Sequence, residues 1–74
     1  MDTLSQRLMV ARRRAGLTQI QLSVKAGISV NSVTTAERFS FATPRTLEKL
    51  AKALGVRVGD LVPPTPASTN EFDA

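Results

Sequence analysis

The chain has 74 residues, and its ten lysines and arginines outnumber its six aspartates and glutamates, which gives a net charge of +4. This length supports one small domain, near the lower limit for folding without a metal or disulfide. The sequence contains neither cysteine nor histidine, so it offers no disulfide framework, no thiolate metal site and no histidine as general base. We therefore expect no enzyme activity, no metal or other cofactor, no small-molecule ligand and a cytoplasmic location.

Five helices and no strand are predicted. The first begins at Thr3, with Gln6 three residues on, and its apolar residues follow helical spacing until Gly16 stops it. These apolar residues are Leu4, Leu8, Ala11 and Ala15. Arg12, Arg13 and Arg14 follow one another, so their side chains spread around the helix. A solvated basic face is the expected role of the last two.

Residues 18 to 37 predict two short helices joined by a tight turn. Thr18 and Gln21 have the spacing of a capping box, and Gly27 stands where a helix ends in a left-handed residue. Ser29 is a good N-cap for the next helix, whose apolar stripe is Val33 and Ala36. The other face of that helix carries short, mostly uncharged side chains, namely Val30, Asn31, Thr34, Thr35 and, at its far end, Arg38. Taken alone, this pattern also fits an ordinary helical hairpin.

The remaining chain predicts two more helices and a tail. Thr43-Pro44 is an N-cap followed by proline, which starts a helix that Gly55 ends, and its core stripe is Leu47, Leu50, Ala51 and Leu54. Phe39 and Phe41 precede this helix and are expected to cap the core, with contact to DNA or to a second subunit as the alternative. Val56, Val58, Leu61 and Val62 form a last apolar cluster around a short helix. Residues 63–74 are rich in proline and read as a disordered tail or the start of a linker.

The charged residues also divide the chain between residues 62 and 63. Residues 1–62 hold all ten basic and four acidic residues, hence +6, whereas residues 63–74 hold Glu71 and Asp73, hence −2. A basic domain favours phosphate polyanions through counterion release, although such a surplus serves solubility equally well. No apolar run approaches the length of a membrane span. The predicted organisation is a domain at 1–62 and a tail at 63–74.

The run from Leu4 to Leu61 resembles the lambda-repressor-like, Xre-type (Cro-like) helix-turn-helix family. The landmarks are Arg12, Gly16-Leu17-Thr18-Gln19, Leu22, Gly27-Ile28-Ser29, Val33, Glu37-Arg38, Pro44, Leu47, Leu50-Ala51 and Ala53-Leu54-Gly55-Val56. Three positions depart from the family pattern: Ser23 replaces a preferred alanine, Phe39 replaces the glycine that closes the third helix, and Gly59 weakens the last helix. The resemblance implies a compact, all-α, five-helix domain with its helix-turn-helix at helices two and three.

The resemblance also implies roles for individual residues. Thr18, Gln19 and Ser29 would hold DNA phosphates, whereas Val30, Asn31, Thr34 and Thr35 would face base edges. Asn31 suits adenine and Val30 suits a thymine methyl. Arg38 and Arg45 would clamp phosphates, and Arg12 would form a structural ion pair with Glu37. The cluster Val56, Val58, Leu61 and Val62 would form the dimer contact, although closing the monomer core is the competing explanation.

The predicted function is a sequence-specific regulator of transcription, most simply a repressor that binds an inverted-repeat operator in double-stranded DNA as a homodimer. Two alternatives stay open. An antitoxin of a toxin-antitoxin pair would use the same DNA-binding surface and bind a protein toxin as well, through the Pro-rich tail. A pure protein-interaction module would have no salt-dependent affinity for DNA, and the basic domain argues against it. If the tail is a linker, it would lead to a ligand-sensing or oligomerising domain.

Overall fold

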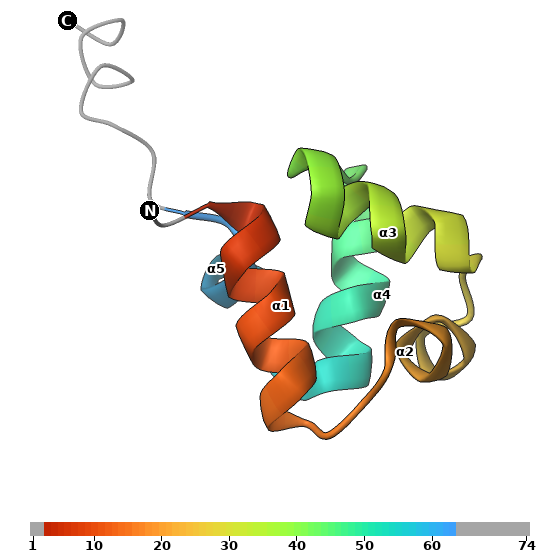
Figure 1. Cartoon of the computed structure of the whole chain (residues 1–74). Helices are drawn as coiled ribbons and strands as arrows, with labels where there is room; N and C mark the ends of the chain where they lie inside the picture. Colours follow the sequence, from red (N-terminus) through yellow and green to blue (C-terminus); the bar gives the residue numbers. More distant parts are fainter. Residues whose placement is uncertain (1–2, 64–74) are drawn as a thin grey trace, which may run out of the picture.

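The computed structural model describes residues 3–63, and these form five helices and no strand (Figure 1). The helices are α1 (Leu4–Arg14), α2 (Gln19–Ala26), α3 (Val30–Phe39), α4 (Pro44–Leu54) and α5 (Val58–Leu61). The all-α, five-helix fold predicted from the sequence is therefore confirmed. Of the tail predicted at 63–74, residues 64–74 lie outside the described residues. Within those residues, no helix is long and apolar enough to cross a membrane.

The predicted start signals cap the helices. The side chains of Thr3, Thr18, Ser29 and Thr43 each accept a hydrogen bond from the backbone N–H three residues on. At α2 the capping box is complete, because the Gln21 side chain also accepts from the Thr18 N–H at 2.9 Å. A cap of this kind is typically worth about 1 kcal/mol, since it satisfies a donor that the helix cannot. Local sequence thus fixes where four of the helices begin.

The turn between α2 and α3 depends on Gly27, whose φ of 71° lies in the left-handed region. Its N–H donates to the carbonyl of Val24, and the next N–H, of Ile28, reaches back to Ser23 at 3.0 Å. Only glycine adopts this conformation without steric cost. Because this turn is tight, α3 begins shortly after the end of α2 and lies across it (Figure 1).

The core is a single cluster at the centre of the five helices. α1 packs on α3 and α5, α2 packs on α3 and α4, and α4 packs on α5. Leu8, Leu22, Val33, Leu50 and Leu61 are the largest fully buried side chains. Each helix contributes one of these side chains, so detachment of any helix would expose part of the core to water. Ala15, by contrast, is exposed as the C-cap of α1 and does not belong to the predicted apolar stripe.

Leu61 corrects one sequence-based assignment. It was expected at a dimer contact, yet its side chain is only 1% exposed and belongs to the monomer core. Val56 and Val58 are half-buried and pack against that same core. Of the predicted dimer cluster, only Val62 remains exposed, at 38%. The reason is that α5 has four residues and lies on α1 and α4, so its apolar side is used within one chain.

The end of α3 also differs from the expected pattern. Phe39 was expected to stand at the position where glycine usually closes this helix, but the helix continues through it. The left-handed residue is Ser40, with a φ of 54°. Ser40 is held there by the start of α1, because its Oγ accepts a hydrogen bond from the N–H of Ser5 at 3.1 Å. The Ser5 hydroxyl in turn donates to the carbonyl of Glu37. Two serines thus join the start of α1 to the end of α3.

Candidate nucleic-acid interface

The exposed side of α3 carries the residues that were expected to read bases. Val30 and Asn31 are exposed, and Thr34 and Thr35 are half-buried. The Thr34 hydroxyl donates to the backbone carbonyl of Asn31 at 3.0 Å, so its oxygen stays available as an acceptor. No hydrogen bond among the described residues engages the Asn31 amide group. This surface can therefore offer one free amide, hydroxyl oxygens and the methyl groups of Val30 to a partner.

The start of α2 presents backbone donors beside this face. The hydroxyl oxygen of Thr18 accepts from the Gln21 N–H at 3.0 Å, and the Leu22 N–H donates to the Thr18 carbonyl at 2.9 Å. The first N–H groups of a helix have no partner inside it, and the helix dipole makes that end favourable for an anion. Ser29 plays the same capping part at the start of α3, where it accepts from the Ser32 N–H at 3.3 Å. Both helix starts can therefore contribute to binding phosphate.

Gln19 has a second partner that the sequence did not indicate. Its side-chain amide donates to Oε1 of Glu37 at 3.0 Å, so the side chain is turned toward the domain. The side-chain amide of Gln19 is therefore engaged within the domain. No local motif predicts this contact, because it joins residues eighteen positions apart on different helices.

Arg12 and Glu37 form the ion pair that joins α1 to α3. Arg12 Nε donates to Glu37 Oε2 at 2.6 Å, and a second guanidinium nitrogen reaches Glu37 Oε1 at 3.2 Å. A third nitrogen of Arg12 donates to the carbonyl of Leu17 at 2.9 Å. The two side chains are 13% and 4% exposed. Together with Gln19, the Glu37 carboxylate thus accepts three hydrogen bonds from side chains, which offset the cost of burying its charge.

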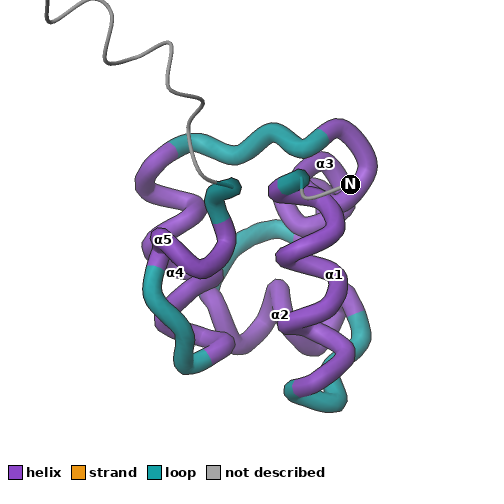
Figure 2. Tube along the Cα trace, turned by 90° about the vertical axis from the view of Figure 1, so that its left-hand side faces the viewer, coloured by secondary structure: helices purple, strands orange, loops and turns teal. Residues whose placement is uncertain are grey.

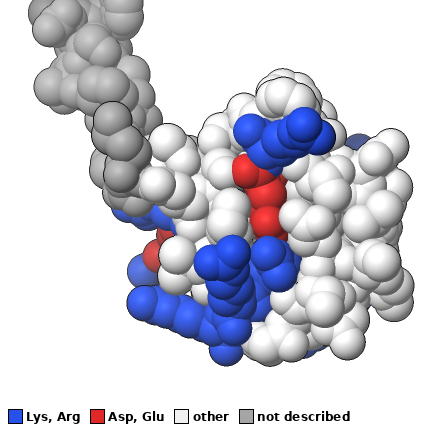
Figure 3. All heavy atoms as spheres, in the orientation of Figure 1, with Lys and Arg blue, Asp and Glu red and all other residues white. Residues whose placement is uncertain are grey.

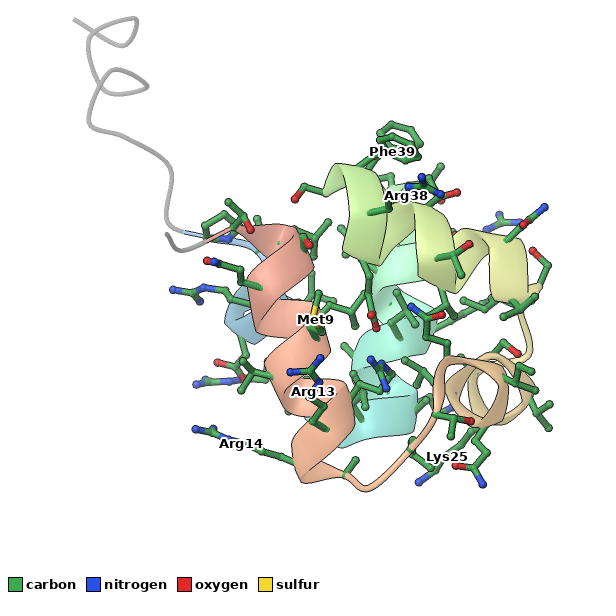
Figure 4. The ribbon with its side chains drawn as sticks, viewed as in Figure 1. Met9, Arg13, Arg14, Lys25, Arg38 and Phe39 are labelled. Atoms are coloured by element: carbon green, nitrogen blue, oxygen red, sulfur yellow. The ribbon has the colours of Figure 1, made fainter. Side chains whose placement is uncertain are left out.

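Basic side chains lie on more than one part of the domain. Figure 3 shows lysines and arginines gathered over the lower part of one face, with a narrow acidic strip above them and a further basic group above that strip. In Figure 4, Arg38 and Phe39 lie at the end of α3, whereas Arg13, Arg14 and Lys25 lie at the opposite end of the view. The guanidinium of Arg38 stands 5.7 Å from the centre of the Phe39 ring, within cation–π range. Arg45 is exposed in the first turn of α4.

A small hollow adjoins the exposed side of α3, where the residues expected to read bases lie. It measures about 170 Å³ and lies between α3 and the start of α4. Its lining consists of Asn31, Ser32, Thr35, Phe41, Ala42, Thr43 and Thr46. All of these residues are uncharged, and most carry a hydroxyl or amide group. The sequence could not indicate this hollow, because it forms only where the loop after α3 turns back toward that helix.

Comparison with known proteins identifies the family to which this chain belongs. The model of the helix-turn-helix family matches residues 8–61, which span α2, α3 and most of the helices packed around them. This confirms the resemblance to the lambda-repressor-like, Xre-type helix-turn-helix. Among curated proteins, none matches the chain.

Proposed function

We propose that this chain, which belongs to the helix-turn-helix family, is a repressor of transcription. It would bind an inverted-repeat operator as a homodimer. Membership of this family makes the chain a DNA-binding regulator of transcription, and the family is not a family of enzymes. Repression, the operator and the dimer are the proposal. Since its partner is DNA, we also propose that it acts in the cytoplasm.

One observation carries the proposal, namely the composition of the exposed side of α3. An amide group without an internal partner and an exposed valine stand in adjacent positions at the start of α3, whose opposite side is packed on the core. An asparagine amide can donate to N7 and accept from the N6 amino group of adenine, while an apolar side chain suits the methyl of thymine. Asn31 and Val30 are therefore the proposed base-reading pair, with Thr34 and Thr35 beside them.

Phosphate contacts would fix how this helix enters the major groove. The helix starts at Thr18, Gln19 and Ser29 supply backbone donors, and Arg38 and Arg45 flank α3 with positive charge. Such contacts carry affinity for any sequence, whereas the side chains of α3 carry the choice of sequence. A single recognition helix reads only a few base pairs, so two copies on an inverted repeat would place two helices about one turn, roughly 10 base pairs, apart.

The test is selection of bound sequences from a random pool of duplex DNA, repeated with Asn31→Ala. We expect an inverted repeat for the natural chain. The variant should bind the best site with about 1 to 3 kcal/mol less affinity and lose preference at one base pair in each half-site. Leu54→Ala, which shortens a half-buried core side chain at the end of α4, serves as a control for general loss of stability. Unchanged preference in the Asn31 variant, or no selected sequence at all, would show that the proposal is wrong.

The antitoxin alternative depends on the Pro-rich tail, of which residues 64–74 lie outside the described residues. Both functions share the DNA-binding surface, so DNA selection does not separate them. Purification of the chain from its own cells does, because an antitoxin brings a small toxin protein with it in a fixed ratio. A repressor of the proposed kind is purified as copies of itself.

A further inference from the structure

Phe39 ends α3 and Phe41 follows in the next loop, and both are exposed rather than capping the core as the sequence had suggested; only Phe41 borders a hollow. Phe39 is 68% exposed and Phe41 is 62% exposed. Phe39 has Arg38 over its ring and lines none of the hollows described for this domain. Phe41 lines two hollows, one on each side of it. An exposed aromatic side chain beside an apolar hollow is a feature of protein contact sites, because aromatic residues are enriched at interfaces.

The second of these hollows is a groove of about 390 Å³ at one end of the domain. Three segments meet there: the start of α1, the loop between α3 and α4, and the residues after α5, which Figure 2 shows at the same end of the molecule. We call this the end groove, and its lining is Thr3, Leu4, Ser40, Phe41, Ala42, Leu47, Val62 and Pro63. Its apolar residues outnumber its two hydroxyls, so it suits an aromatic ring.

The end groove, like the smaller hollow beside α3, has no charged residue in its lining, although the domain has a surplus of basic residues. The larger hollow of about 810 Å³ between α1 and α5 differs in this respect, since Arg7, Arg13 and Arg14 line it along with Asp60. Two copies that met through that hollow would bring their arginines together, and like charges at close range oppose association. The end groove allows two copies to approach without that repulsion.

We propose that the end groove receives Phe41 of a second copy of this chain, and that each copy inserts its Phe41 into the other. A two-fold interface uses one surface patch twice, so the patch must carry both a projection and the hollow that accepts it. Phe41 and the end groove satisfy this condition on one face. This assignment deepens the proposed function, because it places the dimer contact away from α5, where the sequence had suggested it.

The position of the end groove also fits the arrangement that DNA requires. Phe41 and Ala42 line the end groove and also the smaller hollow that Asn31 and Thr35 share. A contact through Phe41 therefore lies directly beside the proposed reading face, so that two copies joined there hold their α3 helices side by side. Such a patch is small, and small interfaces are typical of weak association. We expect few dimers in dilute solution and a full dimer on the operator.

The first experiment compares Phe41→Ala with Phe39→Ala on a full inverted repeat and on an isolated half-site. Both side chains are exposed, so neither variant should lose the helical circular dichroism of the natural chain. Phe41→Ala should bind the full site at least tenfold more weakly and without cooperativity, and should keep its half-site affinity. Phe39→Ala should retain cooperative binding. Cooperative binding by Phe41→Ala, or equal losses in both variants, would overturn the proposal.

The second experiment keeps an aromatic side chain and asks what it touches. Phe41→p-benzoylphenylalanine is photo-crosslinked in an equal mixture of normal and isotopically heavy full-length chains, with and without the duplex. We expect adducts between light and heavy chains at peptides that contain Leu47 or Val62, and no such adducts from the same substitution at Phe39. Adducts only within one chain would assign the groove to a segment of the same chain, and adducts only to DNA would assign Phe41 to the operator; either overturns the proposal.

The two experiments separate this interface from the proposed function. Adducts between chains together with no binding to any duplex would refute the operator-binding function and leave the interface standing. Half-site binding without adducts between chains would refute the interface and leave the operator-binding function standing.

Discussion

The Arg12–Glu37 ion pair gives the sharpest prediction about stability. Arg12→Met removes all three hydrogen bonds of the guanidinium and leaves the Glu37 carboxylate, 4% exposed, with the Gln19 amide as its side-chain donor. Removing one partner of a buried ion pair costs about 3 to 5 kcal/mol, because the other charge stays buried without compensation. Domains of this size are stabilised by about 4 to 11 kcal/mol in all. We therefore expect Arg12→Met to remove a large part of the folding free energy.

The assay is urea and thermal denaturation followed by circular dichroism, with Arg13→Met as the matched control. Arg13 is exposed on the same helix, so its loss should change stability by no more than about 0.5 kcal/mol. A loss of 3 kcal/mol in a domain of this length lowers the Tm by more than about 12 °C. The double variant Arg12→Met/Glu37→Leu should be more stable than Arg12→Met alone, since no charge is then left unpaired. Equal effects at Arg12 and Arg13, or a double variant that costs the sum of the singles, would refute the reasoning.

Three further predictions concern phosphate binding, the core and a family departure. Arg45→Ala should weaken binding to all DNA sequences alike and make the salt dependence shallower by about one unit, and a loss confined to one sequence in binding titrations would contradict this. Leu61→Ala should destabilise the monomer by about 2 to 5 kcal/mol in urea denaturation, whereas Val62→Ala should cost much less; equal costs would place Leu61 at the surface. Ser23→Ala should be neutral or stabilising by up to about 0.5 kcal/mol, because alanine favours the helix and the Ser23 hydroxyl bonds only its own helix, at Ile20. A drop in Tm of Ser23→Ala would contradict that expectation.

The parts of the fold that sequence predicts are those that a few neighbouring residues decide. A threonine that directly precedes a helical stretch can accept from the N–H three residues on, as Thr18 does, and Gly27 adopts a left-handed conformation at no steric cost. The helix starts and the turn follow from such local rules. The apolar stripes follow from helical periodicity, which is also local.

The parts that sequence reasoning missed depend on contacts between distant segments. Ser40 adopts a left-handed conformation that a serine seldom takes, and the hydrogen bond from Ser5 that accompanies it crosses from another helix. Leu61 looked like surplus apolar surface because α5 shows no pattern that says which of its sides meets α1 and α4. The Gln19 side chain was expected near phosphate, and only the packed structure reveals Glu37 beside it. In each case the outcome depends on tertiary contacts that no local pattern specifies.

The structure separates the residues that hold the domain together from those proposed to read DNA, and Gln19 stands between the two groups. Arg12 and Glu37 are buried and hold α1 to α3, whereas Asn31 and Val30 are exposed and contribute little to folding. A change in the first pair should therefore lower affinity for every sequence by the same factor, through the fraction of folded protein. A change in the second pair should alter base preference while the Tm stays constant.

Gln19 belongs to both groups, because its side chain is a hydrogen-bond donor to Glu37 and its backbone N–H is the first of α2. The Glu37 carboxylate thus links α2 to α3, so the helix start proposed to bind phosphate and the face proposed to read bases are held in one fixed arrangement.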